Sequence, residues 1–255
     1  MRFFAISDLH TDFADNWKSL QQFSRYDYKD DALLVAGDIA DGLGVISRTL
    51  SLLRSRFRHV FYVPGNHELW VRTDDCHSIE KFSRIQAHCE GLGIHTRSLK
   101  VGGLWVVPLL SWYDPSFDDD ESADLSQLEG WSDFYFCKWP PEVALPSEYF
   151  LGLNRPFIRS YDAPVISLSH FLPRRDLLPP TRQLSFKGLP RVAGCNGLDQ
   201  QLRAINSRIH VFGHSHINGD RMIEGVRYVQ SKFGYPKERS LTAYRLKLIR
   251  GDEEH

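Results

Sequence analysis

Val63-Pro64-Gly65-Asn66-His67-Glu68 joins the end of an apolar run to a polar loop. The run, 59–63, is rich in β-branched and aromatic residues and is typical of a buried strand. Pro64-Gly65 is a turn signal, so Asn66 and His67 are expected just beyond the carboxyl end of that strand. In an open α/β sheet, ligands bind at this edge. The hexapeptide therefore predicts a site where an amide, as a metal ligand, lies beside an imidazole, as a proton donor.

Other apolar runs along the chain end in polar residues in the same way. The runs are 2–7, 32–36, 165–169 and 209–212, and the polar residues that follow them are Asp8 and His10, Asp38 and Asp41, His170, and His214 and His216. Each of these residues has a simpler explanation when taken alone, since Asp8 could be a helix N-cap and His170 a structural histidine. Because carboxylates, imidazoles and an amide recur at the end of every expected core strand, they indicate one shared metal site.

The ligand types narrow the choice of metal. Mixed oxygen and nitrogen ligands suit Mn²⁺, Fe²⁺/³⁺ or Zn²⁺ rather than Ca²⁺. The candidate ligands are Asp8, His10, Asp38, Asn66, His170, His214 and His216. They are too many for one catalytic ion, which needs open positions, but suit two ions that share a carboxylate. Two ions about 3.5–4 Å apart can hold a bridging hydroxide and bind both oxygens of an in-line phosphoryl displacement.

The segments between the loops indicate an α/β fold. Amphipathic patterns predict helices over 15–25, 45–57, 77–92 and 198–205, a hairpin over 99–110, and late, antiparallel strands over 225–230 and 241–249. This mixture favours a mixed sheet or two sheets packed face to face. Residues 111–162, which include an acidic run at 118–121, interrupt this succession of predicted strands and helices. They are expected to form an irregular insertion, either a lid over the sheet edge or a satellite aromatic cluster, within a single domain of residues 1–255.

Composition excludes several classes of protein. The 255 residues are 42% hydrophobic and 25% charged, with a formal net charge of −1, which argues against a large nucleic-acid or membrane-binding surface. The four cysteines form no CxxC motif and are expected to be reduced thiols. No signal peptide and no apolar run of about 20 residues is present, so a soluble, cytoplasmic protein is expected.

The ordered motifs resemble those of the calcineurin-like metallophosphoesterase superfamily. They are Asp8-x-His10, Gly37-Asp38, Gly65-Asn66-His67-Glu68, His170 and Gly213-His214-x-His216. The resemblance implies a four-layer α/β/β/α sandwich of two mixed sheets. It also implies a dinuclear metal site, with one ion on Asp8, His10, Asp38 and His216 and the other on Asp38, Asn66, His170 and His214. The enzyme would then hydrolyse a phosphate monoester or diester by attack of a metal-bridged hydroxide.

The same resemblance assigns roles to two catalytic candidates. His67 matches the residue that contacts the phosphate and protonates the leaving oxygen. Asp41 matches the residue that orients this histidine in the phosphoprotein phosphatase branch, where a carboxylate raises the basicity of the imidazole. The partner would be a small phosphorylated substrate, with a nucleotide as one option.

The sequence departs from the motifs of several branches of the superfamily, and these differences disfavour the substrates of those branches. Gly42-Leu43 stands where protein phosphatases carry a phosphate-binding arginine, and no tyrosine follows Asp38 as in purple acid phosphatases. The lipid-A pathway hydrolases have arginine in place of His67. The segments 108–113, 137–140 and 169–173 are similar to plant and algal members, a comparison that names no substrate.

The sequence also allows other functions and contains weaker candidate residues. A non-catalytic scaffold with the same fold is the alternative function, and a DNA-repair nuclease is disfavoured by the neutral charge. Arg174 and Arg175 could bind substrate phosphate or lie in a solvated loop. Trp112 and Tyr113 could stack on a nucleobase, although packing in the core or lid is the simpler role. The pairs Cys76-His77 and His88-Cys89 lie at opposite ends of an expected helix and cannot share an ion.

Overall fold

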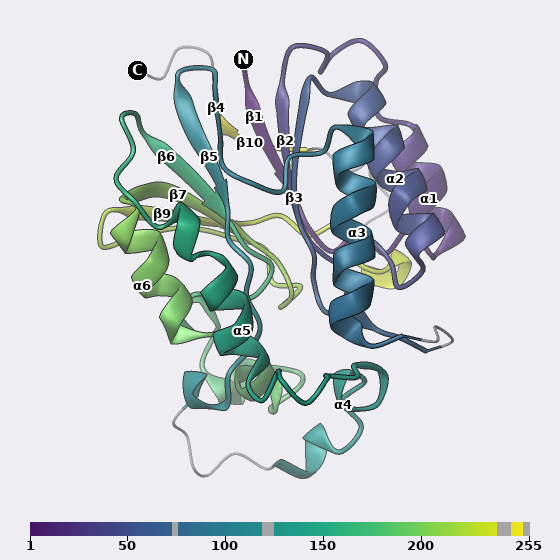
Figure 1. Ribbon diagram of the computed structural model, residues 1–255, viewed down its shortest axis with the longest axis vertical. Coiled ribbons are helices and arrows are strands. Elements are labelled where there is room, and N and C mark those ends of the chain that lie inside the picture. Colours follow the sequence, from purple (N-terminus) through teal and green to yellow (C-terminus); the bar gives the residue numbers. More distant parts are fainter. Residues whose placement is uncertain (73–75, 119–124, 239–245, 252–255) are drawn as a thin grey trace.

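The computed structural model describes residues 1–72, 76–118, 125–238 and 246–251 (Figure 1). Its strands are β1 Phe3–Ile6, β2 Ala32–Ala36, β3 His59–Val63, β4 Leu99–Val101, β5 Leu104–Pro108, β6 Val165–Leu168, β7 Ser207–Phe212, β8 Gly219–Ile223, β9 Val226–Gln230 and β10 Lys247–Arg250. Its α-helices are α1 Ala14–Gln21, α2 Leu43–Arg56, α3 Ser78–Leu92, α4 Asp133–Phe136, α5 Pro146–Leu153 and α6 Asn196–Ala204. Short 3-10 helices lie in the loops, including η1 His67–Leu69 and η8 Pro236–Glu238.

The strands form two mixed sheets. The first has the order β10-β1-β2-β3 and the second the order β4-β5-β6-β7-β9-β8. In the first sheet β1, β2 and β3 are parallel, and β10 runs antiparallel to β1. In the second, β5, β6, β7 and β9 are parallel, while β4 and β8 are antiparallel edge strands. The carboxyl ends of the parallel strands therefore define one rim, at the lower end of Figure 1.

Alternate residues of the strands build the layers, because successive side chains point to opposite faces of a sheet. On β1, Phe4 packs with α2 and α3 residues such as Leu50 and Ile85. Phe3, its neighbour, instead packs against residues of the second sheet such as Val106. Helices α1 to α3 thus cover the first sheet, and α5 and α6 cover the outer face of the second (Figure 1). The expected four-layer α/β/β/α arrangement is confirmed.

Several local predictions were wrong. The edge strand β8 was missed because its sequence, Gly219–Ile223, is largely exposed and shows no apolar alternation. The expected antiparallel pairing of the late strands holds for β9 with β8 and for β10 with β1, but β9 pairs in parallel with β7 on its other side. The segment 111–162 was expected to be irregular, but it contains helix α5, which begins at a proline that suits a first helical turn.

Some predictions fall outside the part of the chain that is described. Residues 119–121 of the acidic run and 241–245 of the last expected strand belong to this group. Among the described helices, none combines the length and apolar character needed to cross a lipid bilayer.

Candidate metal centre

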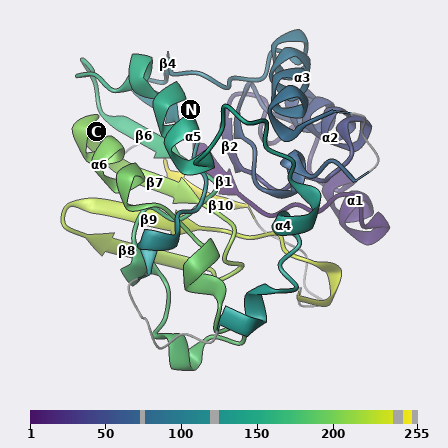
Figure 2. The same ribbon diagram turned by 60° about the horizontal axis from the view of Figure 1, so that its bottom comes forward.

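The loops that leave β1, β2, β3, β6 and β7 meet at the rim of the two sheets, which pack face to face (Figure 2). They bring together the candidate ligands Asp8, His10, Asp38, Asn66, His170, His214 and His216, of which all except His216 are buried. Parallel strands explain the convergence, since every one of these loops leaves its sheet at the same end.

The loop backbones are held in an uncommon conformation. Seven non-glycine residues have positive φ in the described chain, and five of them are candidate ligands: Asp8, His10, Asp38, His214 and His216, with φ between 43° and 69°. Each such residue costs about 1–3 kcal/mol and persists only where its surroundings enforce it. This concentration of strain marks the rim as a functional site.

Glycines let the loops approach closely. A Cβ atom on Gly65 would lie 2.2 Å from the Oδ1 atom of Asp38, and one on Gly37 would lie 2.5 Å from the Nδ1 atom of His170. Gly213 is similarly confined by the carbonyl of Ala36. Side chains at these positions would push the loops apart, so the glycines of the sequence motifs set the spacing of the ligands.

One group of ligand atoms comes from Asp8, His10, Asp38 and His216, whose atoms all lie within 4.8 Å of one another. The Nε2 atoms of His10 and His216 are 3.1 Å apart, and Nε2 of His216 is 3.4 Å from Oδ1 of Asp8. Nδ1 of His216 donates to Oε2 of Glu238 at 2.8 Å, which leaves Nε2 facing the group. A cation there would bind two imidazoles and two carboxylates.

The second group comes from Asp38, His170 and His214, joined by Asn66. Nδ1 of His170 donates to the carbonyl of Ala36 at 2.8 Å, and Nε2 of His214 donates to the carbonyl of Val192 at 2.9 Å. A carbonyl only accepts, so the other nitrogen of each neutral ring carries a lone pair.

Those lone pairs face one another. Nε2 of His170, Nδ1 of His214 and Oδ1 of Asn66 lie 3.1–3.2 Å apart. The Asn66 amide nitrogen is turned away and donates to Asp133 at 2.9 Å. Three acceptors at this spacing, with no proton between them, repel unless a cation lies among them. The donor set therefore fits a metal ion.

The pKa shifts agree with this fit. Burial lowers the pKa of His170, and burial with the neighbouring His170 holds the pKa of His214 well below its ordinary value, which favours the neutral rings that a metal would need as ligands. Burial, together with the charges of Glu68 and Asp8, raises the pKa of Asp38 well above the usual range. Asp38 belongs to both groups, and such a carboxylate needs either a proton or cations beside it.

At the first group, two carboxylates act on the His216 imidazole. Burial lowers the pKa of His216, but the carboxylates of Asp8 and Glu238 outweigh it and raise this pKa to about 9. A metal ion held by His216 would need the lone pair of its Nε2 atom, so the affinity of this group for metal would fall as the pH is lowered.

Three acidic residues that sequence reasoning gave no role support the centre. Glu68 is fully buried and accepts from the backbone N–H groups of Asp38, Ile39 and Gly65, which joins the loops after β2 and β3. Glu238 binds His216, and Asp133 binds Asn66. Glu68 lies within the motif and could have been suspected, whereas Asp133, at the start of α4, and Glu238, in η8, carry no sequence signal.

The two catalytic candidates do not meet as expected. The backbone N–H of His67 donates to Oδ1 of Asp38, its Nε2 is 3.8 Å from Oδ2 of Asp38, and its ring lies 3.7 Å from that of Trp70. Asp41 instead pairs with Arg72, with Nε and Oδ2 3.0 Å apart. No hydrogen bond joins Asp41 to His67 in the described chain, because the Asp41 carboxylate is held by Arg72.

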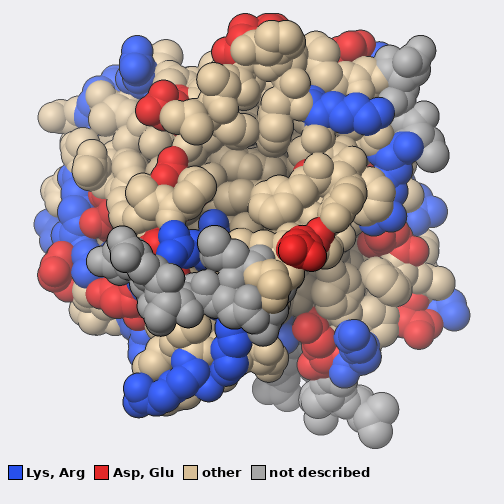
Figure 3. Space-filling view, turned by 90° about the horizontal axis from the view of Figure 1, so that it is seen from below, with Lys and Arg blue, Asp and Glu red and all other residues tan. Residues whose placement is uncertain are grey.

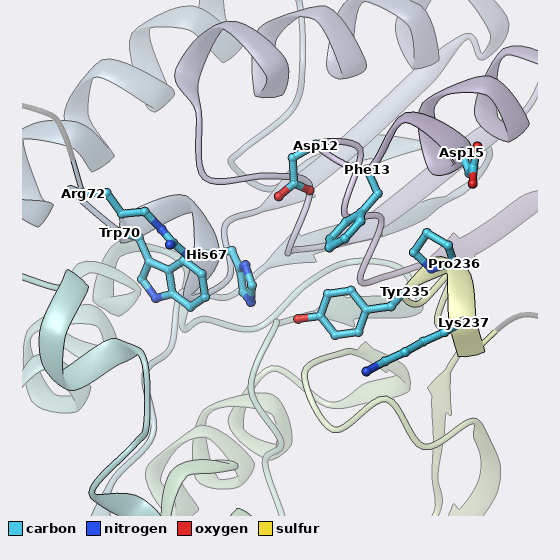
Figure 4. A pocket seen from close by; sticks show the side chains of 9 residues that line it. All are labelled: Asp12, Phe13, Asp15, His67, Trp70, Arg72, Tyr235, Pro236 and Lys237. Atoms are coloured by element: carbon cyan, nitrogen blue, oxygen red, sulfur yellow. The ribbon is translucent and has the colours of Figure 1, made fainter.

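A cavity of about 610 Å³ opens beside His67 (Figure 4). Trp70 and Arg72 lie with His67 on one side of it, and Phe13, Tyr235 and Lys237 lie on the other. Its size suits an organic group rather than a phosphate alone. Seen from the rim, charges of both signs surround a hollow lined by other residues (Figure 3).

The weaker candidates have structural roles. Arg174 pairs with Asp176 and Glu224, and Arg175 pairs with the buried Asp118. Trp112 is 3% exposed and packs with Phe150 and Phe171 in an aromatic cluster. The four cysteines are free thiols.

Comparison with known proteins agrees with this geometry. The family model described as calcineurin-like phosphoesterase matches residues 1–218. The chain belongs to the calcineurin-like phosphoesterase family. As a member, it is a phosphoric ester hydrolase, in line with the expectation from its motifs.

Two comparisons point to relatives of this phosphoesterase. A curated protein named [acyl-carrier-protein] phosphodiesterase PptH, from Mycobacterium tuberculosis, is 27% identical over 92% of this chain and 78% of its own length. The crystal structure of phosphopantetheinyl hydrolase (PptH) from the same organism matches with a TM-score of 0.81 at 25% identity, over 100% of this chain and 97% of that one. A second solved structure, 16% identical with a TM-score of 0.52, shares the fold alone.

Proposed function

We propose that this phosphoesterase is a two-metal phosphodiesterase that cleaves the phosphodiester between a phosphopantetheine arm and a carrier protein. The observation that carries the metal-dependent chemistry is the convergence of acceptor atoms from Asn66, His170 and His214 without a proton between them. The substrate follows from the likeness to PptH over nearly the whole chain.

The proposed ligand sets keep the sequence assignment. One divalent ion would be held by Asp8, His10, Asp38 and His216, and the other by Asp38, Asn66, His170 and His214, with Mn, Fe or Zn as the metal. When bound, the ions supply Lewis acidity that neutralises charge on the transferred phosphoryl group.

His67 would act as the general acid toward the leaving oxygen. Its Nε2 lies near Asp38, and Trp70 fixes the plane of its ring. Without phosphate, burial and the neighbouring histidines, first His10, hold the pKa of His67 well below its ordinary value. A bound phosphate anion beside the ring would favour the protonated form. We propose that Asp41 serves His67 only indirectly, by holding Arg72 at the cavity wall.

The cavity beside His67 would hold the organic part of the substrate. The rings of Phe13, Trp70 and Tyr235 offer apolar surface, and the cations Arg72 and Lys237 lie on its wall. A pantetheine arm, which is long, amide-rich and mostly uncharged, suits a cavity of this size and lining.

The test is release of the arm from a holo acyl carrier protein in the presence of Mn²⁺, followed by intact-protein mass spectrometry. We expect the holo carrier protein to be converted to the apo form, and we expect this conversion to stop when a chelator removes the metal. Para-nitrophenyl phosphate and its bis ester serve as reference substrates for monoester and diester cleavage. Turnover of the bis ester without turnover of the holo carrier protein would contradict the proposed substrate. If none of these three substrates is turned over in a metal-dependent way, the result would support the alternative of a non-catalytic scaffold.

A further inference from the structure

Asp133, at the start of α4, touches the candidate metal centre from the segment 111–162. Its Oδ1 atom accepts from Nδ2 of Asn66 at 2.9 Å and from Nε1 of Trp70 at 2.6 Å. Its Oδ2 atom accepts from Nε1 of Trp131 at 2.8 Å. The residue is 3% exposed, so solvent takes little part in holding this carboxylate.

The partners of Asp133 line both sides of the centre. The Trp70 ring lies against His67, with 3.7 Å between ring centroids. The Trp131 ring meets His214 edge-on, with 6.0 Å between centroids. The Tyr113 hydroxyl also forms a hydrogen bond to Asp133. All of these donors are neutral, and no lysine or arginine of the described residues forms an ion pair with Asp133. A buried negative charge held only by neutral donors is stabilised by cations nearby.

The Asn66 amide has two orientations, which exchange its oxygen and nitrogen. With the nitrogen toward Asp133, the oxygen faces the lone pairs of His170 and His214. In the reverse orientation, the NH₂ group would donate to those same lone pairs and satisfy them without a metal. An acceptor-only carboxylate at Asp133 disfavours that reverse orientation, because two oxygens would then face each other.

We propose that Asp133 is a positioning residue that keeps the Asn66 oxygen directed at the second metal. It thereby prevents the Asn66 NH₂ group from donating hydrogen bonds to the lone pairs of His170 and His214. The proposal rests on the two-metal function above. On this proposal, the segment 131–137 contributes to the structure of the metal centre and does not only cover it.

Asp118 provides a matched control within the same segment. It too is 3% exposed, but it pairs with Arg175 and Arg191. Replacing Asp118 removes a buried carboxylate of 111–162 without removing a partner of a metal ligand. A purely structural role for Asp133 predicts that the two replacements have the same effect on metal binding.

The experiment is titration of the chelator-stripped full chain with Mn²⁺, with wild type, Asp133→Asn, Asp118→Asn, Asn66→Ala and the Asn66→Ala/Asp133→Asn double variant. Calorimetry gives the stoichiometry and the affinity of each ion, and circular dichroism follows thermal unfolding of the metal-free forms. We expect Asp133→Asn to weaken one of two ions about 10–100-fold, the usual effect of losing such a partner. Asp118→Asn should leave both affinities within about twofold of wild type, whatever its effect on unfolding.

In the Asn66→Ala background, Asp133→Asn should change metal affinity little, because the residue acts through Asn66. Wild-type affinity in Asp133→Asn, an equal loss in Asp118→Asn, or an undiminished loss in the Asn66→Ala background would each overturn the proposal. Should Asp133→Asn not fold, Trp131→Phe removes one hydrogen bond that holds Asp133 and should weaken the same ion severalfold, and no change would contradict the proposal. Failure of wild type to bind two ions would instead contradict the two-metal function.

Discussion

Asp38→Ala is expected to remove metal from the protein and to lower kcat by about 10³-fold or more. Asp38 is the one residue common to both ligand groups, and its Oδ1 atom lies 3.4 Å from Nε2 of His170. Loss of a shared carboxylate weakens both ions at once. The charge stabilisation that bound ions supply is worth several kcal/mol, and each 1.36 kcal/mol corresponds to tenfold in rate. Metal content per chain and kcat with a diester substrate measure the two effects.

Asp31→Ala is the matched control for Asp38→Ala, because the two aspartates lie at opposite ends of β2. Asp31 is 4% exposed and binds Arg2, far along the strand from the rim. Its replacement should lower thermal stability and leave the metal content unchanged. Full metal content and turnover in Asp38→Ala would contradict the assigned ligand groups.

His67→Ala is expected to keep both ions and to lose about 10²–10⁴-fold in kcat on a substrate with an alkoxide leaving group, the range for loss of a general acid. The hydrogen bond from His67 to Asp38 comes from the backbone N–H, which alanine keeps, while the ring only approaches Asp38 and His10, with 3.8 Å between its Nε2 atom and Oδ2 of Asp38. The loss should be much smaller with para-nitrophenolate, a leaving group that needs little protonation.

The pH dependence gives His67 a second signature. Its protonated form is the active one, so kcat on an alkyl diester should fall as pH rises through the pKa of His67 in the substrate complex. This limb should vanish in His67→Ala. His59→Ala, outside the rim, provides a control and should keep the wild-type profile. An equal loss for both leaving groups, or loss of metal in His67→Ala, would exclude the general-acid role.

The ligand types and their convergence could be predicted from sequence because they depend on local patterns. Each apolar strand ends in a polar loop, and parallel strands bring those loops to one rim. The supporting residues could not be predicted in this way. Asp133 reaches Asn66 from 67 positions away, and Glu238 reaches His216 from a loop after β9. Contacts of this kind depend on tertiary packing rather than on any periodicity.

The position of Asp41 shows the limit of carrying a role over by motif. Its spacing from Asp38 matches the expected pattern, but its carboxylate forms an ion pair with Arg72. Arg72 also lies over the rings of Trp70 and Phe136, so its place is fixed by contacts that a motif does not record. Strand β8 was missed for a related reason, since an exposed edge strand lacks the apolar alternation that reveals its neighbours.

Anomalous X-ray diffraction from Mn²⁺-loaded crystals tests most directly whether five loops hold two cations at one rim. We expect two anomalous peaks about 3.5–4 Å apart, the usual spacing in two-metal sites, with the Asp38 carboxylate in contact with both. A map with no peak within bonding distance of Asp38, His170 and His214 would contradict the claim.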